Sequence, residues 1–164
     1  MIDIVLVKEN EIQELSDFST AIEKEHYDPI IGAAQNDYML NLFQSVEGFK
    51  KAIEKGSKVY WVNVDGKRAG YFSIYPRDGK MYLSKFYLHK DFRGKGISKE
   101  MLSFIKSEAR KLNLPSIFLN VNKHNYGSIK AYEHLGLKKI RDEVTDIGSG
   151  FFMDDYIYET SSEQ

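Results

Sequence analysis

The stretch Arg93-Gly94-Lys95-Gly96-Ile97-Ser98 has the residue types and the spacing of an anion-binding turn. Its two glycines allow the main chain to turn sharply, so that consecutive N–H groups converge where the next helix begins. The start of a helix carries about half a positive charge and amides without partners, both of which suit a phosphate. We therefore predict a phosphate cradle here, with Arg93 and Lys95 at its rim. The alternative is that the glycines only end a strand.

The same stretch fits neither of two common nucleotide-binding templates. Position 99 is a lysine where a dinucleotide-binding turn has its third glycine, and no Gly-Lys-Ser/Thr ending completes a P-loop. A dinucleotide or ATP fold is therefore disfavoured.

A second group of polar residues lies on one predicted helix. Asn125, Ser128 and Tyr132 are three and then four residues apart, so they share one face of a helix expected over residues 125–135. Two structural alternatives stay open. Asn125 suits a plain helix cap, and Tyr132 suits a core aromatic with its hydroxyl at the surface.

The elements that position these groups follow from apolar periodicity and turn residues. Asp65-Gly66 and Asp78-Gly79 are strong hairpin signals, so three strands in the middle of the chain are expected to form a meander. The order of elements predicts an α/β fold, a mixed and mostly antiparallel sheet with helices on both faces. The expected strands span residues 2–7, 58–64, 68–77, 80–88, 116–121, 137–144 and 151–159. A first helix is expected after the cap Asn10, and three more over 38–55, 97–112 and 125–135. A loop or short turn is expected at 25–36.

Length and composition indicate a single globular domain. The chain has 164 residues, of which 42% are hydrophobic and 29% charged, and its net charge of −1 gives no electrostatic case for nucleic acid or an anionic membrane as partner. We predict one domain over residues 1–159 and a frayed polar tail over 160–164. The chain has no cysteine, and its four histidines lack metal-ligand spacing, so we expect no metal site. No leader or membrane-spanning run is apparent, which favours a cytoplasmic protein.

The chain resembles the GCN5-related N-acetyltransferases (GNAT) from its first strand to its last hairpin. The family pattern of Arg or Gln, two residues, Gly, one residue, then Gly or Ala is met by Arg93, Gly96 and Ser98, where Ser98 departs from the usual apolar ending. A second family element, Asn followed seven residues later by Tyr and then a Gly-Phe-like stop, is met by Asn125, Tyr132 and Gly136-Leu137. Residues 146–156 resemble the closing hairpin of a bacterial subgroup similar to polyamine and ribosomal-protein acetyltransferases.

This resemblance implies that an amine attacks the thioester of acetyl-CoA, the co-substrate. Tyr132 would then be the catalytic acid, because a phenol of pKa about 10 is protonated at neutral pH and can donate to a thiolate whose pKa is about 8.5. The backbone of the strand would pair with the pantetheine arm, the glycine turn would hold the pyrophosphate, and Asn125 would bond the cofactor near its amide. The residues expected to bind the cofactor are Phe86, Tyr87, Leu88, Arg93, Gly94, Lys95, Gly96, Ile97, Ser98, Asn125 and Ser128.

The proton acceptor is where the chain departs from the family. Many relatives carry a glutamate at positions that correspond here to Ser84 and Asn120, and neither side chain is a useful base. The absence points to a less basic amine, a water relay or a base from elsewhere. Candidates for that other base, each of which also suits a solvated surface group, are His26, Asp28, Asp154 and Asp155.

Other functions stay open at this stage. The missing glutamates would also suit a non-catalytic acyl-CoA-binding or regulatory module, and transfer of a different acyl group depends on the pocket volume. The expected acceptor is a small-molecule or peptide amine. The aromatic content of 13% leaves rings for an acceptor cleft or a homodimer surface, and those considered are Tyr27, Tyr38, Tyr71 and Tyr75.

Overall fold

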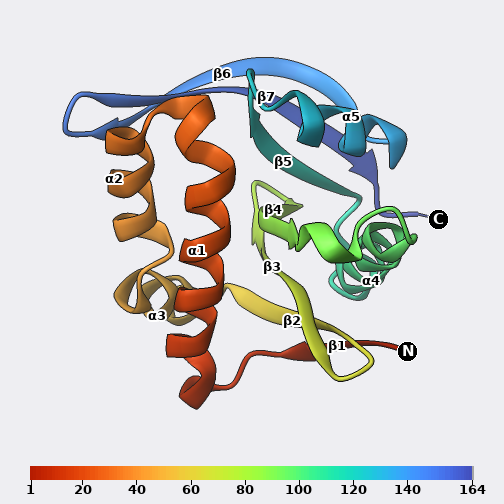
Figure 1. The fold of residues 1–164 in the computed structure, drawn as a ribbon. Coiled ribbons are helices and arrows are strands. Elements are labelled where there is room, and N and C mark those ends of the chain that lie inside the picture. Colours follow the sequence, from red (N-terminus) through yellow and green to blue (C-terminus); the bar gives the residue numbers. More distant parts are fainter. Residues whose placement is uncertain (164) are drawn as a thin grey trace.

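The computed structural model describes residues 1–163 and contains a seven-stranded sheet in the order β1-β2-β3-β4-β5-β7-β6 (Figure 1). Neighbouring strands are antiparallel except β4 and β5, which are parallel. The predicted α/β class with a mixed, mostly antiparallel sheet is confirmed. The strands are β1 (Ile2–Leu6), β2 (Lys58–Val64), β3 (Lys67–Arg77), β4 (Lys80–Leu88), β5 (Ser116–Asn122), β6 (Lys138–Gly148) and β7 (Phe151–Ser161). The helices are α1 (Ile12–Ile31), α2 (Ala33–Phe43), α3 (Val46–Glu54), α4 (Ile97–Lys111) and α5 (Tyr126–His134), with 3₁₀ turns at Glu9–Glu11 and Lys90–Phe92.

The two hairpins predicted in the middle of the chain are confirmed. Asp65 and Gly66 have φ of 50° and 80°, and Asp78 and Gly79 have φ of 53° and 75°. Positive φ at both central residues is the geometry of the turn that matches the twist of two antiparallel strands. These turns fix the register of β2, β3 and β4, and thereby the face on which each side chain lies.

The sheet has a hydrophobic core on each face. On one face α4 and α5 cover the sheet, with Met101 and Ile105 among the fully buried side chains. On the other face α1 and α3 pack against Trp61 and Tyr71 through Leu15 and Phe49. Figure 1 shows α1, α2 and α3 together on one side of the sheet and α4 on the other.

The predicted loop at residues 25–36 is wrong, because α1 continues to Ile31 and α2 begins at Ala33 after Gly32. Past Leu15, several of the inward-facing residues of α1 are polar, although they recur at helical spacing. The apolar pattern that predicts a helix therefore ends before the helix itself ends. The polar members of this side are Ser16, Ser19 and Glu23, at intervals of three and four residues, and then His26 and Tyr27, which follow Glu23 by three and four. Asn10 is not the cap either, since it lies inside the turn Glu9–Glu11 and α1 starts at Ile12.

The helix predicted over residues 38–55 is two helices. Ser45 caps α3, and its hydroxyl accepts a hydrogen bond from the Gly48 N–H at 3.0 Å. Gly48 packs so closely on the end of α2 that a Cβ there would lie 2.5 Å from the Leu42 carbonyl oxygen. The chain therefore turns at residues 44–45 where the periodicity alone predicts continuity.

The first residues of the predicted tail belong to the sheet. Strand β7 pairs Ser161 with Ser116, two residues beyond the predicted domain boundary, and Ser162 is buried. The Arg110 guanidinium donates a hydrogen bond to the Ser162 carbonyl oxygen. Residue 164 of the predicted tail lies outside the described residues.

The two parallel strands separate soon after they begin. Their ladder consists of Met81 opposite Ile117 and Tyr82 opposite Phe118. On its other edge β4 pairs with β3 along its whole length, with a register shift after Ser73. The β5-facing edge of residues 83–88 is thus left without a strand partner among the described residues, and a gap opens in the middle of the sheet.

Candidate active site

A cavity of about 710 Å³ lies at this gap, between α1 and α2 on one side and β4, β5, β7, α4 and α5 on the other. Nine of the twelve residues predicted to form the site line it, namely Phe86, Tyr87, Leu88, Arg93, Gly94, Ile97, Ser98, Ser128 and Tyr132. Lys95, Gly96 and Asn125 are not among the lining residues. Sequence segments far apart in the chain therefore meet at one cavity.

The glycine turn presents free backbone amides at the start of α4. Gly94 and Gly96 have φ of 76° and 78°, a left-handed conformation that favours glycine, and Gly96 is the N-cap of α4 without a capping side chain. Within residues 1–163, the N–H groups of residues 94–98 donate no hydrogen bond of standard geometry. The buried Ile97 side chain anchors this helix start in the core. The arrangement suits an anion.

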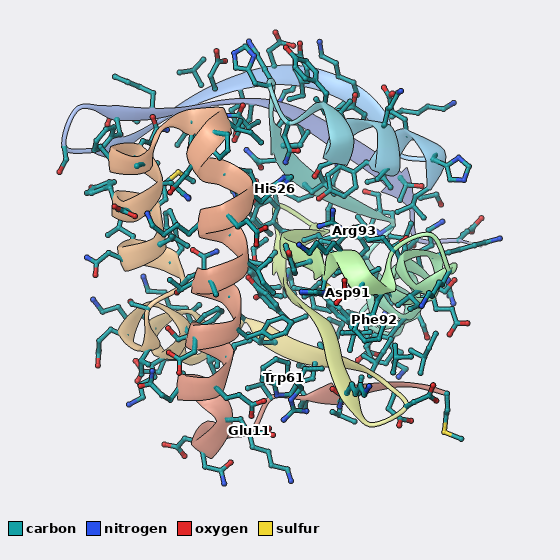
Figure 2. The ribbon with its side chains drawn as sticks, in the orientation of Figure 1. Glu11, His26, Trp61, Asp91, Phe92 and Arg93 are labelled. Atoms are coloured by element: carbon teal, nitrogen blue, oxygen red, sulfur yellow. The ribbon has the colours of Figure 1, made fainter. Side chains whose placement is uncertain are left out.

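The two cationic side chains of the turn, Arg93 and Lys95, contact neighbouring residues of the protein. The Arg93 Nε donates to the Leu88 carbonyl oxygen at 3.0 Å, and its guanidinium carbon is 5.9 Å from the centre of the Tyr87 ring. The Lys95 ammonium is 5.9 Å from the Phe92 ring centre. Arg93 thus fastens the turn to the end of β4 (Figure 2).

Tyr132 projects from α5 toward β4. Its ring centre is 6.1 Å from that of Phe86, and its side chain lines the cavity. Burial, with a smaller contribution from the Glu23 carboxylate, raises the pKa of Tyr132 to about 12. The phenol is therefore protonated throughout the neutral range and is available as a proton donor.

Asn125 fixes the start of α5 and ties it to α1. Its side chain is 1% exposed, its Oδ1 accepts from the Ser128 N–H at 3.3 Å and lies 3.2 Å from the His26 Nε2, and its Nδ2 donates to the Tyr27 hydroxyl at 3.0 Å. Figure 2 shows His26 on the side of α1 that faces the sheet. The structure thus gives this amide the cap role considered from the sequence and a second role between helices; the predicted cofactor contact stays a prediction.

Glu23 is a site residue that the sequence reasoning missed. It lies on the cavity side of α1, and its Oε1 accepts from the Tyr71 hydroxyl at 2.9 Å, which itself lies 2.7 Å from the Ser19 hydroxyl. Burial raises the pKa of Glu23, while the same hydrogen bond and the Lys85 ammonium oppose that rise. Burial lowers the pKa of Lys85. The signal that locates Glu23 is its helical spacing from Leu15 and Ser19.

The two positions at which the resemblance leads us to expect a glutamate, Ser84 and Asn120, hold hydrogen-bonding side chains. The Ser84 hydroxyl donates to the Ser73 carbonyl oxygen at 3.1 Å. Asn120 accepts from the Tyr82 hydroxyl at 3.0 Å, and its Nδ2 donates to the Glu143 Oε2 at 3.0 Å and to the Asp155 Oδ2 at 3.4 Å. An amide on β5 therefore holds two carboxylates from β6 and β7 at the cavity wall.

The four predicted candidate bases differ in their surroundings. Asp28 accepts from Asn36 at 2.8 Å and pairs with Lys24 at 2.9 Å, and these contacts, led by Asn36, lower its pKa. The Asp154 side chain is 53% exposed and pairs with Lys123 at 2.9 Å. His26 and Asp155 line the cavity.

Asp155 is the candidate with the most perturbed acidity. The residue is 3% exposed, and burial, to which Glu143 and Asp154 add, raises its pKa to about 6 although the Asn120 hydrogen bond opposes the rise. A carboxylate of this kind can take up a proton close to neutral pH. Among residues 1–163, no cluster of three or more His, Cys, Asp or Glu has the arrangement of a metal site, and no helix is long and apolar enough to cross a membrane.

Comparisons with known proteins find related sequences. Residues 16–137 match the family described as Acetyltransferase (GNAT) family. Of curated proteins, an uncharacterized N-acetyltransferase in the pepI 3′ region of Lactobacillus delbrueckii subsp. lactis is 27% identical over 101 residues, which cover 57% of this chain and 58% of that protein. A probable spermine N(1)-acetyltransferase of Bacillus subtilis subsp. natto is 30% identical over 73 residues, which cover 42% of this chain and 48% of that protein. The chain thus matches about half the length of these curated relatives.

Solved structures share the fold over nearly the whole chain. The PaiA N-acetyltransferase from Thermoplasma acidophilum in complex with coenzyme A superposes with a TM-score of 0.80 at 19% identity, covering 98% of this chain and 99% of that one. YncA from Salmonella typhimurium, a putative acetyltransferase with its cofactor acetyl-CoA, has a TM-score of 0.65 at 17% identity, covering 99% and 95%. At these sequence identities, the superpositions show that the fold is shared.

Proposed function

Because the chain belongs to the acetyltransferase (GNAT) family, we propose that it transfers an acetyl group from acetyl-CoA to a primary amine of a small molecule or peptide, with Tyr132 as the general acid. The observation that carries this proposal is the gap between β4 and β5, where an unpaired strand edge, a helix start and a protonated phenol meet at one cavity. Two structural neighbours described with coenzyme A or acetyl-CoA support the choice of co-substrate.

The residues at the gap fit the parts of acetyl-CoA. The free edge of β4 at Phe86, Tyr87 and Leu88 suits the amides of the pantetheine arm, since an extended ligand can add to a sheet edge through main-chain hydrogen bonds. The free amides of residues 94–98 suit the pyrophosphate. An N–H of β4 near Leu88 would also stabilise negative charge on the thioester oxygen.

Tyr132 suits protonation of the leaving sulfur. A thiol has a pKa of about 8.5, so a phenol that remains protonated at neutral pH can donate to the thiolate as the carbon–sulfur bond breaks. The aromatic neighbour Phe86 gives the partly buried phenol an apolar side, which strengthens its hydrogen bond to a charged sulfur.

The cavity wall favours a cationic acceptor. Glu23 on α1 and the pair Glu143 and Asp155 on β6 and β7 place carboxylates on opposite walls, and an amine arrives largely as an ammonium at neutral pH. The relative described as a probable spermine N(1)-acetyltransferase agrees with such an acceptor. These carboxylates also count against a module that has lost proton transfer. The homodimer and the cytoplasmic location expected from the sequence stay predictions.

A coenzyme A release assay tests the proposal. Because the chain has no cysteine, a thiol-reactive chromophore reports released coenzyme A without background from the protein. The amine panel contains polyamines, aminoglycosides, free amino acids and N-terminal peptides. We expect Tyr132→Phe to lower kcat by about tenfold or more while calorimetry finds acetyl-CoA affinity nearly unchanged.

Tyr126→Phe is the matched control, because Tyr126 lies on the same helix with 68% of its surface exposed. Equal turnover by Tyr132→Phe and the unaltered chain would remove Tyr132 from the mechanism. No heat on titration of the unaltered chain with acetyl-CoA would overturn the proposed function as a whole.

A further inference from the structure

A row of polar side chains crosses three strands on the cavity wall opposite α1. In the register of the sheet Glu143 lies opposite Asp155, and Asp155 lies opposite Asn122. Asn120 precedes Asn122 by two residues and so shares its face of β5. All four side chains line the cavity.

Within this row the Asp155 carboxylate is buried but only partly bonded. Its Oδ2 accepts from the Asn120 Nδ2, and within residues 1–163 no side chain or main-chain donor reaches its Oδ1. Among the described residues the buried polar side-chain atoms without a partner belong to Trp61, Ser73, Glu108 and Ser116, so the Asp155 Oδ1 is instead open to the cavity. The residue is 3% exposed, yet it faces a cavity with room for a ligand.

The other carboxylates near the cavity already have partners. Glu23 accepts from the Tyr71 hydroxyl and faces the Lys85 ammonium. The Glu143 Oε1 lies 3.6 Å from the Arg141 guanidinium, and its Oε2 accepts from Asn120. Asp155 is thus the carboxylate of this wall with an oxygen left for an incoming N–H donor.

We propose that Asp155 is the catalytic proton acceptor that activates the amine, and that Asn120 is its positioning residue. The assignment rests on the proposed acetyl transfer. The carboxylate that this chain lacks on β5 is then supplied by β7, and the amide at the β5 position holds it against the cavity through the 3.4 Å contact. The Tyr82 hydroxyl fixes the orientation of that amide, because it donates to the Asn120 Oδ1.

The protons balance across the step. An ammonium acceptor gives one proton to the Asp155 carboxylate and becomes a neutral amine, whose nitrogen forms the bond to the acetyl carbon as the carbon–sulfur bond breaks. The electron pair of that bond leaves on sulfur, which takes the proton of Tyr132. The nitrogen's second proton returns to the Tyr132 phenolate, and Asp155 releases its proton to solvent.

Burial of the carboxylate, modified by the groups around it, sets the pH at which Asp155 works. Glu143 and Asp154 raise its pKa, whereas Lys123 and the Asn120 hydrogen bond lower it, and burial outweighs them all. The titratable groups that line the cavity from its helices are Glu23, His26 and Tyr27 on α1 and Tyr132 on α5. The acid limb of the pH profile of kcat/KM is therefore expected near pH 6.

The experiment compares Asp155→Asn with Asp154→Asn in the full chain, using coenzyme A release with the best amine of the panel. We expect Asp155→Asn to lower kcat/KM at pH 7 by about a hundredfold, the usual contribution of a general base, with acetyl-CoA affinity unchanged by calorimetry. The loss should shrink as the pH approaches the amine's own pKa of about 10, because a neutral amine needs no base. Asp154→Asn, whose exposed side chain pairs with Lys123, should retain activity, with the acid limb moved slightly to lower pH because the Asp154 charge helps to raise the pKa of Asp155.

An exchange variant keeps the assignment falsifiable. Asn120→Asp combined with Asp155→Asn returns a carboxylate to the same wall and should recover part of the lost activity together with an acid limb. Retention of activity and of the unaltered pH profile by Asp155→Asn would overturn the assignment, as would an equal loss in Asp154→Asn. Failure of the unaltered chain to release coenzyme A with any amine would instead overturn the proposed function, and the assignment with it.

Discussion

Replacing Asp155 by asparagine should make the folded protein more stable at neutral pH. Burial raises the pKa of Asp155 from 3.8 to about 6, so between these values the folded chain holds a proton that the unfolded chain has lost. Stability therefore falls as the pH rises through this window. A difference of about 2 units corresponds to about 3 kcal/mol of unfolding free energy, all of it lost above pH 7. Asparagine has the same shape without the buried charge.

Urea denaturation of the two chains at pH 4 and pH 7.5 measures this effect. We expect the two chains to unfold with nearly equal free energies at pH 4, and the variant to be more stable by about 2 to 3 kcal/mol at pH 7.5. Carboxylates that do not interact with Asp155 titrate alike in both chains, so their contributions cancel in the comparison. Asp154→Asn, which loses an exposed ion pair, should show no such gain at pH 7.5. A gain of equal size at both pH values, or none at either, would refute the reasoning.

Two further predictions concern the elements that hold the site. Asn125→Ala removes the cap of α5 and leaves the Tyr27 and His26 contacts unmade, so urea denaturation should show a loss of about 2 to 4 kcal/mol. Ser45→Ala, which removes the partly exposed cap of α3 and its bond to the Asn41 carbonyl oxygen, should cost about 1 kcal/mol. Equal losses would show that the tie to α1 contributes nothing. Gly70→Ala would place a Cβ 2.1 Å from the Tyr87 carbonyl oxygen, so the edge of β4 must move. Thermal denaturation should show a loss of about 1 to 3 kcal/mol, and calorimetry weaker acetyl-CoA binding, whereas unchanged binding would argue against the proposed use of that edge.

The parts of the fold that the sequence predicts well are those encoded locally. The Asp-Gly turns carry their own backbone preference, and β2 and β4 have the predicted bounds. The loop predicted at residues 25–36 is wrong because the prediction depends on apolar residues at helical spacing. Ser19, Glu23 and His26 have that spacing but are polar. A helix that lines a polar cavity presents such a pattern, since its inward side faces solvent or ligand instead of core.

The site also has parts that local sequence patterns predict and parts that depend on how the strands pair. The glycine turn and the face of α5 with Tyr132 are local patterns, and the structure places both at the cavity. The contact of Asn120 with Glu143 and Asp155 joins three strands, and its geometry depends on the register of β5, β7 and β6. No spacing along the chain shows that register. The sequence alone therefore does not distinguish Asp155 from Asp154, His26 and Asp28 as the candidate base.

The hydrogen bonds of Asn125 have a consequence for engineering this protein. Because one amide touches both His26 and Tyr27 on α1 and also begins the helix that carries Tyr132, the α1 wall of the cavity and the proposed acid are structurally coupled. A chimera that imports a foreign α1 to change amine preference would also shift the phenol. Exchanges of specificity in this scaffold should therefore transplant α1 together with the first turn of α5.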